Sequence, residues 1–233
     1  MAEARDDTWD DLYRLWAAAR ETSRDAEDGR TAAARRRVGR NTQDDWRWLA
    51  EALADPERKW FVARMFAQAP VPRRLLGPML RAGVLERNPS ANRRFIEPCV
   101  ASLGGRRVLE GLLRYLESGN DAEKAGAVSA LYWATGNPRN EALDALRERI
   151  WHAMLREFVA NPDLDLRRQI ISMLRLEPEA YPEELRPLVP AAIEIARSHA
   201  DEYLHHRVEV QLGANSLLIP IPTARPDRSY QFH

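Results

Sequence analysis

Internal repetition constrains the fold of this chain more than any other feature of its sequence. Three twelve-residue segments, which begin at Asp55, Asp121 and Asp163, follow one pattern. Each begins with an acidic residue, places a second acidic residue two positions later, and continues with apolar residues at helical spacing. An acidic side chain can accept hydrogen bonds from the free N–H groups at a helix N-terminus, where negative charge is also favourable. Each segment is therefore predicted to start an α-helix.

The spacing of these helices predicts a repeat that contains two helices. Weaker copies of the pattern begin at Asn88 and Asp201, so the five starts lie at residues 55, 88, 121, 163 and 201. Intervals of about 33 to 45 residues provide room for a helix, a turn and a second helix. The stretch before each start has the apolar pattern of another helix, and no convincing strand pattern competes. The predicted first helices are residues 43–54, 72–82, 106–118, 140–159 and 182–198.

This pattern resembles the second helix of a HEAT repeat. An acidic start, a basic residue shortly after it and an apolar pair four residues apart carry the resemblance, which covers residues 42–213. The matching residues are Asp55, Glu57, Lys59, Val62 and Phe66, then Asp121, Glu123, Lys124, Val128 and Tyr132, then Asp163, Asp165, Arg167, Ile170 and Leu174. The resemblance implies an all-α fold, a right-handed superhelix of about five helix pairs whose second helices form a concave surface. It implies little about activity, because a fold does not determine a function.

The N-terminal residues 1–41 differ from the repeats, as the terminal units of a repeat protein do. An amphipathic helix is predicted near the start of the chain and is expected to cap the first repeat. The arginine-rich stretch 24–40 that follows can form either a helix or a loose connector. The apolar face of the capping helix consists of Trp9, Leu12, Trp16 and Ala19.

The C-terminal residues 214–233 are predicted to form an extended tail. Several prolines interrupt this segment, and proline is incompatible with a helix interior. Its apolar stretch 217–221 either folds back to cap the last repeat or stays exposed as a docking segment.

Composition limits the compartment and the kind of partner. Thirty-five basic residues balance 35 acidic residues, so no overall field attracts the chain to nucleic acid or to an anionic membrane. The single cysteine, Cys99, has no partner for an intramolecular disulfide, which favours a reducing compartment. The N-terminus lacks the apolar region of a secretion signal, and no run of 18 apolar residues occurs. We therefore expect a cytoplasmic protein without a membrane segment.

The second helices have one face that is predicted to be buried. Positions 8 and 12, counted from the capping residue, are apolar in the five copies and lie one helical turn apart. Burying one such side chain contributes about 1.5–3 kcal/mol. The predicted core residues are Val62, Phe66, Phe95, Cys99, Val128, Tyr132, Ile170, Leu174, Val208 and Leu212.

Positions 6, 10 and 13 lie about half a turn away and, by the HEAT resemblance, would line the concave surface. Arginine and tryptophan recur there, and both residue types dominate the energetics of protein interfaces. The candidate partner-binding residues are Trp60, Arg64, Arg93, Glu97, Trp133, Arg168, Ser172, Arg175 and His206. The alternative interpretation is that the arginines are ordinary solvent-facing residues and that the tryptophans pack between layers.

Motifs for catalysis or metal binding are weak in this sequence. Asp201, His205 and Glu209 share a helix face, but no matching motif supplies further His or Cys ligands, so a face of solvated ion pairs is favoured. Cys99 follows Pro98 at a predicted core position, which favours packing over nucleophilic catalysis. No glycine-rich phosphate loop or nucleophile elbow is present. We therefore expect no catalytic residue, no metal and no cofactor.

The sequence leaves two functional hypotheses. The first is a non-enzymatic scaffold or adaptor that binds a protein partner, with an acidic partner suited to the arginines, through the concave face. The second is a HEAT-like DNA-binding protein or alkylpurine DNA glycosylase, since those enzymes combine aromatic residues, an acid and arginines in one groove. Trp60, Trp133 and Glu97 offer these residue types, but the neutral charge balance argues against a surface that follows phosphates. The oligomeric state is left open.

Overall fold

The computed structural model describes residues 7–39, 41–134 and 141–213, and within these ranges the regular structure is entirely helical. The described residues contain twelve α-helices, three short 3-10 helices and no strand, so the predicted all-α class is confirmed. The α-helices are α1 (Trp9–Thr22), α2 (Arg24–Val38), α3 (Gln43–Ala54), α4 (Arg58–Phe66), α5 (Leu76–Val84), α6 (Pro89–Leu103), α7 (Gly105–Ser118), α8 (Asp121–Ala134), α9 (Glu141–Ala160), α10 (Leu164–Ile171), α11 (Leu188–Ser198) and α12 (Glu202–Gln211). The 3-10 helices are η1 (Arg73–Leu75), η2 (Pro178–Ala180) and η3 (Glu183–Leu185).

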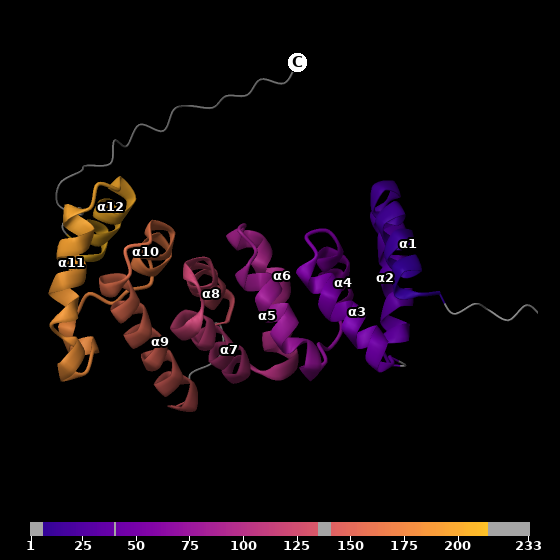
Figure 1. The fold of residues 1–233 in the computed structure, drawn as a ribbon, viewed down its shortest axis with the longest axis horizontal. Helices are drawn as coiled ribbons and strands as arrows, with labels where there is room; N and C mark the ends of the chain where they lie inside the picture. The colour runs from indigo at the N-terminus through magenta and orange to yellow at the C-terminus, as the bar shows by residue number, and fades with distance from the viewer. Residues whose placement is uncertain (1–6, 40, 135–140, 214–233) are drawn as a thin grey trace, which may run out of the picture.

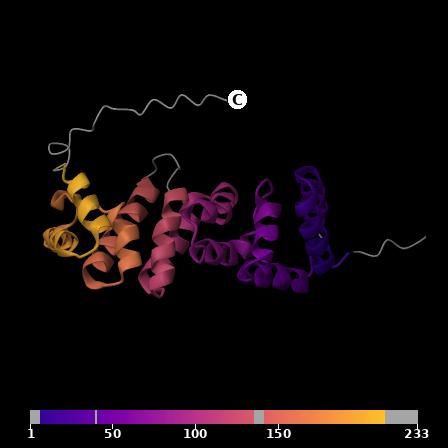
Figure 2. The same cartoon turned by 90° about the horizontal axis from the view of Figure 1, so that it is seen from above.

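The helices pack in chain order. From α3 onward, each odd-numbered helix contacts the next odd-numbered helix, and from α2 onward each even-numbered helix contacts the next even-numbered one. The helices therefore form two rows in an elongated array, with α1 and α2 at one end and α11 and α12 at the other (Figures 1 and 2). The even-numbered helices from α4 to α12 correspond to the predicted second helices, and α3 has the bounds that its sequence predicts.

Capping side chains explain where three of the five predicted second helices begin. In these helices the predicted residue is the N-cap, and its side-chain oxygen accepts a hydrogen bond from a backbone N–H group in the first turn, which would otherwise lack a partner. The acceptor and donor residues are Asn88 and Ser90 at 3.0 Å, Asp163 and Leu166 at 2.8 Å, and Asp201 and Leu204 at 3.2 Å. The prediction is wrong for Asp55, because the N-cap of α4 is Glu57, and Asp55 instead accepts the backbone N–H groups of Glu57 at 2.9 Å and Arg58 at 2.8 Å in the turn before the helix.

In helix α8 the predicted cap, Asp121, is wrong by one residue. Its cap is Asn120 instead of Asp121, because the Asn120 side chain accepts the backbone N–H of Glu123 at 2.9 Å. A shift of one residue turns the helix face by about 100°. Tyr132, predicted to lie in the core, is consequently 69% exposed, whereas Leu131 beside it is buried.

Eight of the ten predicted core residues are buried, and the exceptions are Tyr132 and Leu212. The prediction that Leu212 is buried is wrong for a different reason from the prediction for Tyr132. It is the residue that follows the last turn of α12, and no later helix of the described chain covers it, so it stays 39% exposed.

The first helix pair resolves the alternative that the sequence left open. Residues 24–38 form α2, which packs on α1 and α4, so the stretch is a helix of a sixth pair and not a loose connector. Arg35 of α2 donates hydrogen bonds to the carbonyl oxygens of Arg64 at 3.1 Å and Met65 at 2.7 Å. A cation is favourable at this C-terminal end of α4, where carbonyl groups lack helical partners.

The described α1 residues that were predicted to share an apolar face are all buried. Trp9 stacks on Trp48 of α3 with 5.8 Å between ring centroids, and Trp16 lies 5.4 Å from Phe61 of α4. The predicted extended tail, residues 214–233, lies outside the described residues. A helix with the length and apolarity needed to cross a membrane does not occur in the described parts of the chain.

Candidate functional site

A groove lies between the first helix pair and helices α4 and α6. Its volume is about 1080 Å³, and its walls carry five arginines, two glutamates, two tryptophans and four alanines. Four of the predicted partner-binding residues line it together, namely Trp60, Arg64, Arg93 and Glu97. We call this surface the N-terminal groove, and the other residues used below to define it are Trp16, Arg20, Arg24, Glu27 and Arg94.

Small side chains explain why a groove forms at this place. Helices α2 and α6 both pack on α4, so α4 lies between the two walls. The groove is lined along α4 by Ala63 and along α6 by Ala91 and Ala101. Because a methyl group fills little of the space between neighbouring helices, the long arginine side chains border an open hollow.

Trp60 is the aromatic centre of the groove. Its half-buried ring lies 5.3 Å from the ring of Phe95, which is fully buried in α6. The cations of Lys59 and Arg94 lie over the Trp60 ring at 5.0 and 5.7 Å. Such cation–π contacts contribute about 0.5–1 kcal/mol at exposed sites and restrict the cation to the ring face.

Arg64 was predicted to bind a partner, but its guanidinium is paired with carboxylates of α2. Its Nε lies 3.6 Å from Glu27 Oε1, and its Nη2 pairs with Asp28 of α2. Two carboxylates thus compensate the charge of Arg64 and join α4 to α2. Arg64 shapes the groove wall and is not free to bind an anion.

The other arginines of the N-terminal groove lack a carboxylate partner within the described chain. Arg20 lies over the Trp16 ring at 5.7 Å, Arg94 over Trp60, and Arg93 over the ring of Trp133 at 5.7 Å. Arg24 makes neither an ion pair nor a ring contact. Glu97 is exposed and likewise unpaired among the described residues. Four uncompensated arginines therefore face one uncompensated carboxylate.

Trp133 of α8 lies beside the groove and helps to hold it. Its indole N–H donates to the carbonyl oxygen of Pro89, in the first turn of α6, at 3.0 Å. The ring also carries the Arg93 guanidinium. The alternative interpretation, that the tryptophans pack between helices, therefore describes Trp133 well.

The remaining predicted residues lie outside the groove. Arg168 of α10 pairs with Asp201 at 2.5 Å, and the Ser172 hydroxyl donates to the carbonyl oxygen of Gln169 at 3.0 Å. His206 is exposed on α12, at the opposite end of the array (Figure 1).

Arg175 requires a correction. Helix α10 ends at Ile171, so counting helical positions onward to Arg175 does not give its direction. Its guanidinium carbon lies 3.2 Å from the ring centroid of Trp151 in α9. Arg175 therefore packs against the first helix of its pair instead of lining the face formed by the second helices.

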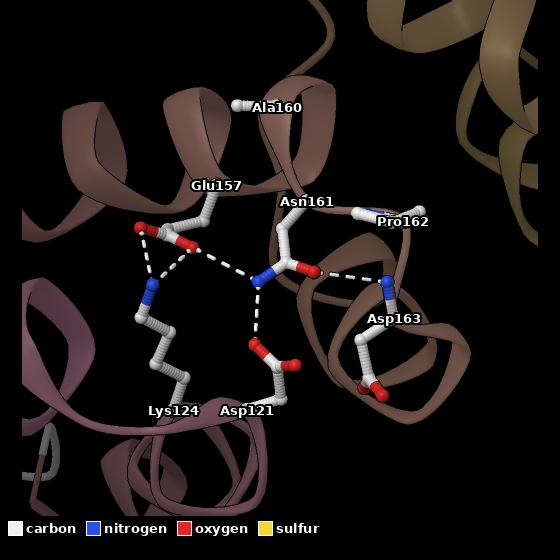
Figure 3. A pocket seen from close by; sticks show the side chains of 7 residues that line it. All are labelled: Asp121, Lys124, Glu157, Ala160, Asn161, Pro162 and Asp163. Carbon is white, nitrogen blue, oxygen red and sulfur yellow. Dashed lines mark hydrogen bonds and ion pairs between the residues drawn. The ribbon is translucent and has the colours of Figure 1, made fainter.

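A second, shallower hollow of about 580 Å³ lies where α8, α9 and α10 meet (Figure 3). Lys124 donates to both oxygens of Glu157 at 2.8 Å, and Asn161 donates to Asp121 at 2.7 Å. Asn161 also accepts the backbone N–H of Asp163 at 2.9 Å. Because these polar groups satisfy one another, they fix the helices and leave little capacity for a ligand.

A similar lysine–glutamate pair occurs two helix pairs earlier in the chain. Lys59 of α4 pairs with Glu86 at 2.7 Å, and Glu86 accepts the backbone N–H of Asn88, the cap of α6, at 2.9 Å. In both places a lysine of one second helix pairs with a glutamate of the next helix pair, namely Glu86 in the turn after α5 and Glu157 in the last turn of α9. The recurrence indicates a structural role for these lysines.

Sequence reasoning missed five of the residues that define the N-terminal groove: Trp16, Arg20, Arg24, Glu27 and Arg94. The first four belong to α1 and α2, which were interpreted as a cap and a possible connector. Arg94 follows the predicted Arg93, and their adjacency on an exposed helix face was the available signal. The arginine content of residues 24–40 was the corresponding signal for the first pair.

Chemistry for catalysis is sparse in the described part of the chain. Burial raises the pKa of Cys99 to about 12, so this thiol stays protonated and is a poor nucleophile. No group of three or more His, Cys, Asp or Glu side chains within the described ranges is arranged to hold a metal ion.

Comparison with known proteins assigns no family to the chain. No protein-family model, no curated protein and no solved structure matches it. Its function must therefore be inferred from the N-terminal groove and the residues that form it.

Proposed function

We propose that this chain is a HEAT-like scaffold or adaptor, without enzymatic activity, that holds a protein partner in the N-terminal groove. For the fold, we propose a right-handed superhelix of helix pairs with the second helices on its inner face. The two rows of helices, each packed on its neighbours in chain order, support this arrangement. The buried, unpaired Cys99 is compatible with the cytoplasmic location that the sequence favours.

The observation that carries the functional proposal is the convergence of Trp60, Arg93 and Glu97 with Arg20 and Arg24 on one groove. Trp and Arg are the residue types that contribute most to binding energy at protein interfaces. The alanine-lined walls of the groove leave space for a segment of a partner.

A capture experiment tests this proposal. The chain carrying Trp60→Ala, Arg93→Ala and Arg94→Ala is expressed in cells and crosslinked there. The proteins recovered with it are compared with those recovered with the wild-type chain. We expect the groove variant to lose at least one partner that wild type recovers reproducibly, because its aromatic and cationic contacts are gone. Circular dichroism and thermal melting establish that the variant remains folded.

A matched control removes similar side chains elsewhere. Arg87→Ala, Arg156→Ala and Tyr203→Ala change two exposed arginines and one exposed aromatic ring outside the groove. This variant should recover the same partners as wild type. If the groove variant also recovers all of them, the proposed function is wrong.

Nucleic-acid binding is the second hypothesis, and the arrangement of charge favours it less. The uncompensated arginines gather in one groove, and Arg168 farther along the array is neutralised by Asp201. A surface that follows a duplex needs cations spaced along it. Incubation with alkylated duplex DNA, with assays for retention and base release, provides the direct test, and release of a base would replace the scaffold proposal.

A further inference from the structure

The N-terminal groove has a charge pattern that selects the chemistry of its ligand. Arg64 is compensated by Glu27 and Asp28, whereas Arg20 and Arg24 on one wall and Arg93 and Arg94 on the other have no carboxylate within 4 Å in the described chain. We propose that the groove binds an extended acidic peptide segment of the partner, whose carboxylates pair with arginines on both walls. This inference rests on the proposed function and names the chemical class of the partner segment.

Three of the four arginines lie over tryptophan rings, an arrangement that leaves them able to form such pairs. A guanidinium over an aromatic ring can still direct the N–H groups of its own plane to a carboxylate, which it can bind with two parallel hydrogen bonds. Arg20, Arg93 and Arg94 each lie over a tryptophan at 5.7 Å. Because these cation–π contacts already restrict the arginine side chains, less conformational entropy is lost when the ligand binds.

The position of the arginines indicates an extended ligand. Arg20 and Arg24 belong to α1 and α2, and Arg93 and Arg94 belong to α6, so a ligand that meets both pairs must cross α4. At about 1080 Å³, the groove is at the upper end of small-molecule pockets, which measure about 300–1000 Å³. A peptide with carboxylates at its two ends and small residues between them fits this geometry.

Glu97 favours a peptide over a nucleic acid. Its exposed carboxylate lies in the groove among the arginines. A nucleic-acid strand carries a phosphate at every nucleotide and would bring one of them near this carboxylate. A peptide can place its own acidic residues apart and so reduce this repulsion without removing it.

Removing the charge of Glu97 should strengthen binding of the acidic peptide. Glu97→Gln removes the repulsive charge and keeps the size and polarity of the side chain. We expect it to tighten binding of an acidic peptide about twofold to threefold, since one like-charge contact at an exposed site is worth a few tenths of a kcal/mol. Damage to the fold would weaken binding instead.

The test uses the full chain and a fluorescein-labelled peptide with a Glu-Asp pair at each end and a Gly-Ser-Gly-Ser segment between the pairs. Binding is measured by fluorescence anisotropy at about 50 mM salt, where exposed charges are weakly screened. Arg93→Gln with Arg94→Gln, and separately Arg20→Gln with Arg24→Gln, should each weaken binding about tenfold. The control Arg87→Gln with Arg156→Gln, which changes exposed arginines elsewhere, should bind like wild type.

Three outcomes would overturn the inference: equal binding of a Lys-Lys-Gly peptide, unchanged binding in both arginine variants, or tighter binding of a single-stranded DNA probe. These outcomes are separable from failure of the proposed function. If cellular partners need the groove but the acidic peptide does not bind, only the peptide class is wrong. If the peptide binds in the groove but no cellular partner depends on it, the scaffold proposal is wrong.

Discussion

Single residues decide how closely neighbouring helices approach. A Cβ atom at Gly126 of α8 would lie 1.8 Å from the carbonyl oxygen of Val84, at the end of α5. A side chain at this position requires backbone movement, because a carbonyl group within a packed helix cannot turn aside as a flexible side chain can. Gly126 is therefore fixed by the contact between α5 and α8.

Gly126→Ala should consequently destabilise the protein by about 3 kcal/mol, as overpacking against backbone does. Urea unfolding followed by circular dichroism measures the change. Gly77→Ala in α5 is the control, since no heavy atom lies within 4 Å of its added Cβ, and it should be neutral or stabilising by up to about 1 kcal/mol. Equal stability of the two variants would contradict the close approach.

Asp45 makes stability depend on pH. Burial alone would raise its pKa, but hydrogen bonds from the Thr42 backbone N–H and hydroxyl, and from Arg37, outweigh this effect and lower the pKa to about 2. A carboxyl with a lowered pKa in the folded state stabilises that state above its unfolded pKa, near 4. The stabilisation is lost as pH falls towards 2.

At neutral pH, Asp45→Asn should reduce the free energy of unfolding by about 2 kcal/mol, because one pKa unit corresponds to about 1.4 kcal/mol. Urea unfolding of wild type and variant between pH 7 and pH 2 measures the difference. It should be constant above about pH 5 and disappear near pH 2. A difference that does not change with pH would show that the charge of Asp45 is not responsible.

At the scale of elements, polar links join successive helix pairs. Lys124 and Glu157 connect α8 to α9, and their side chains are only 16% and 21% exposed. Asn161 continues this link to the cap of α10 (Figure 3). A pair withdrawn this far from water is screened less than a surface pair, and removing one partner leaves a poorly solvated charge.

A double-mutant cycle with Lys124→Met and Glu157→Gln should therefore give a coupling energy of about 1 kcal/mol or more. The control cycle uses Arg106 and Glu110, a pair on α7 whose side chains are 68% and 41% exposed. Its coupling should stay below about 0.5 kcal/mol. If the effects of the two substitutions were additive, the ion pair of Lys124 and Glu157 would not stabilise the contact between α8 and α9.

At the scale of the whole molecule, stability should vary along the array. Each helix contacts helices that are near it in the chain, so a terminal helix has fewer neighbours. Helix α12 packs on α10 and α11 and buries two of its residues, whereas α7 buries seven. Local opening costs least where little apolar surface is buried.

Amide hydrogen exchange followed by mass spectrometry tests this expectation. Peptides from α12 should exchange at least about tenfold faster than peptides from α7, because the free energy of opening should differ by more than about 1.4 kcal/mol. Uniform protection along the array would instead indicate that the described helices unfold as one cooperative unit.

Local sequence patterns are sufficient to predict the helices and most of their buried faces. Capping by Asn88 and Asp163 and the burial of Val62 and Ile170 follow from residues within one or two helical turns, and local hydrogen bonds and periodicity act over that distance. The exposed Tyr132 was misplaced because Asn120 and Asp121 are both good caps, and a local pattern does not choose between them.

The packing of the helices, in contrast, sets which arginines are available to a partner. Arg64 and Arg93 occupy helix positions that the sequence treats alike, yet Arg64 meets Asp28, 36 residues earlier in the chain, whereas Arg93 meets Trp133 and no carboxylate. The N-terminal groove likewise exists because α2 lies beside α4. Charge compensation and hollows depend on neighbours distant in the chain, so they are set when helices pack together.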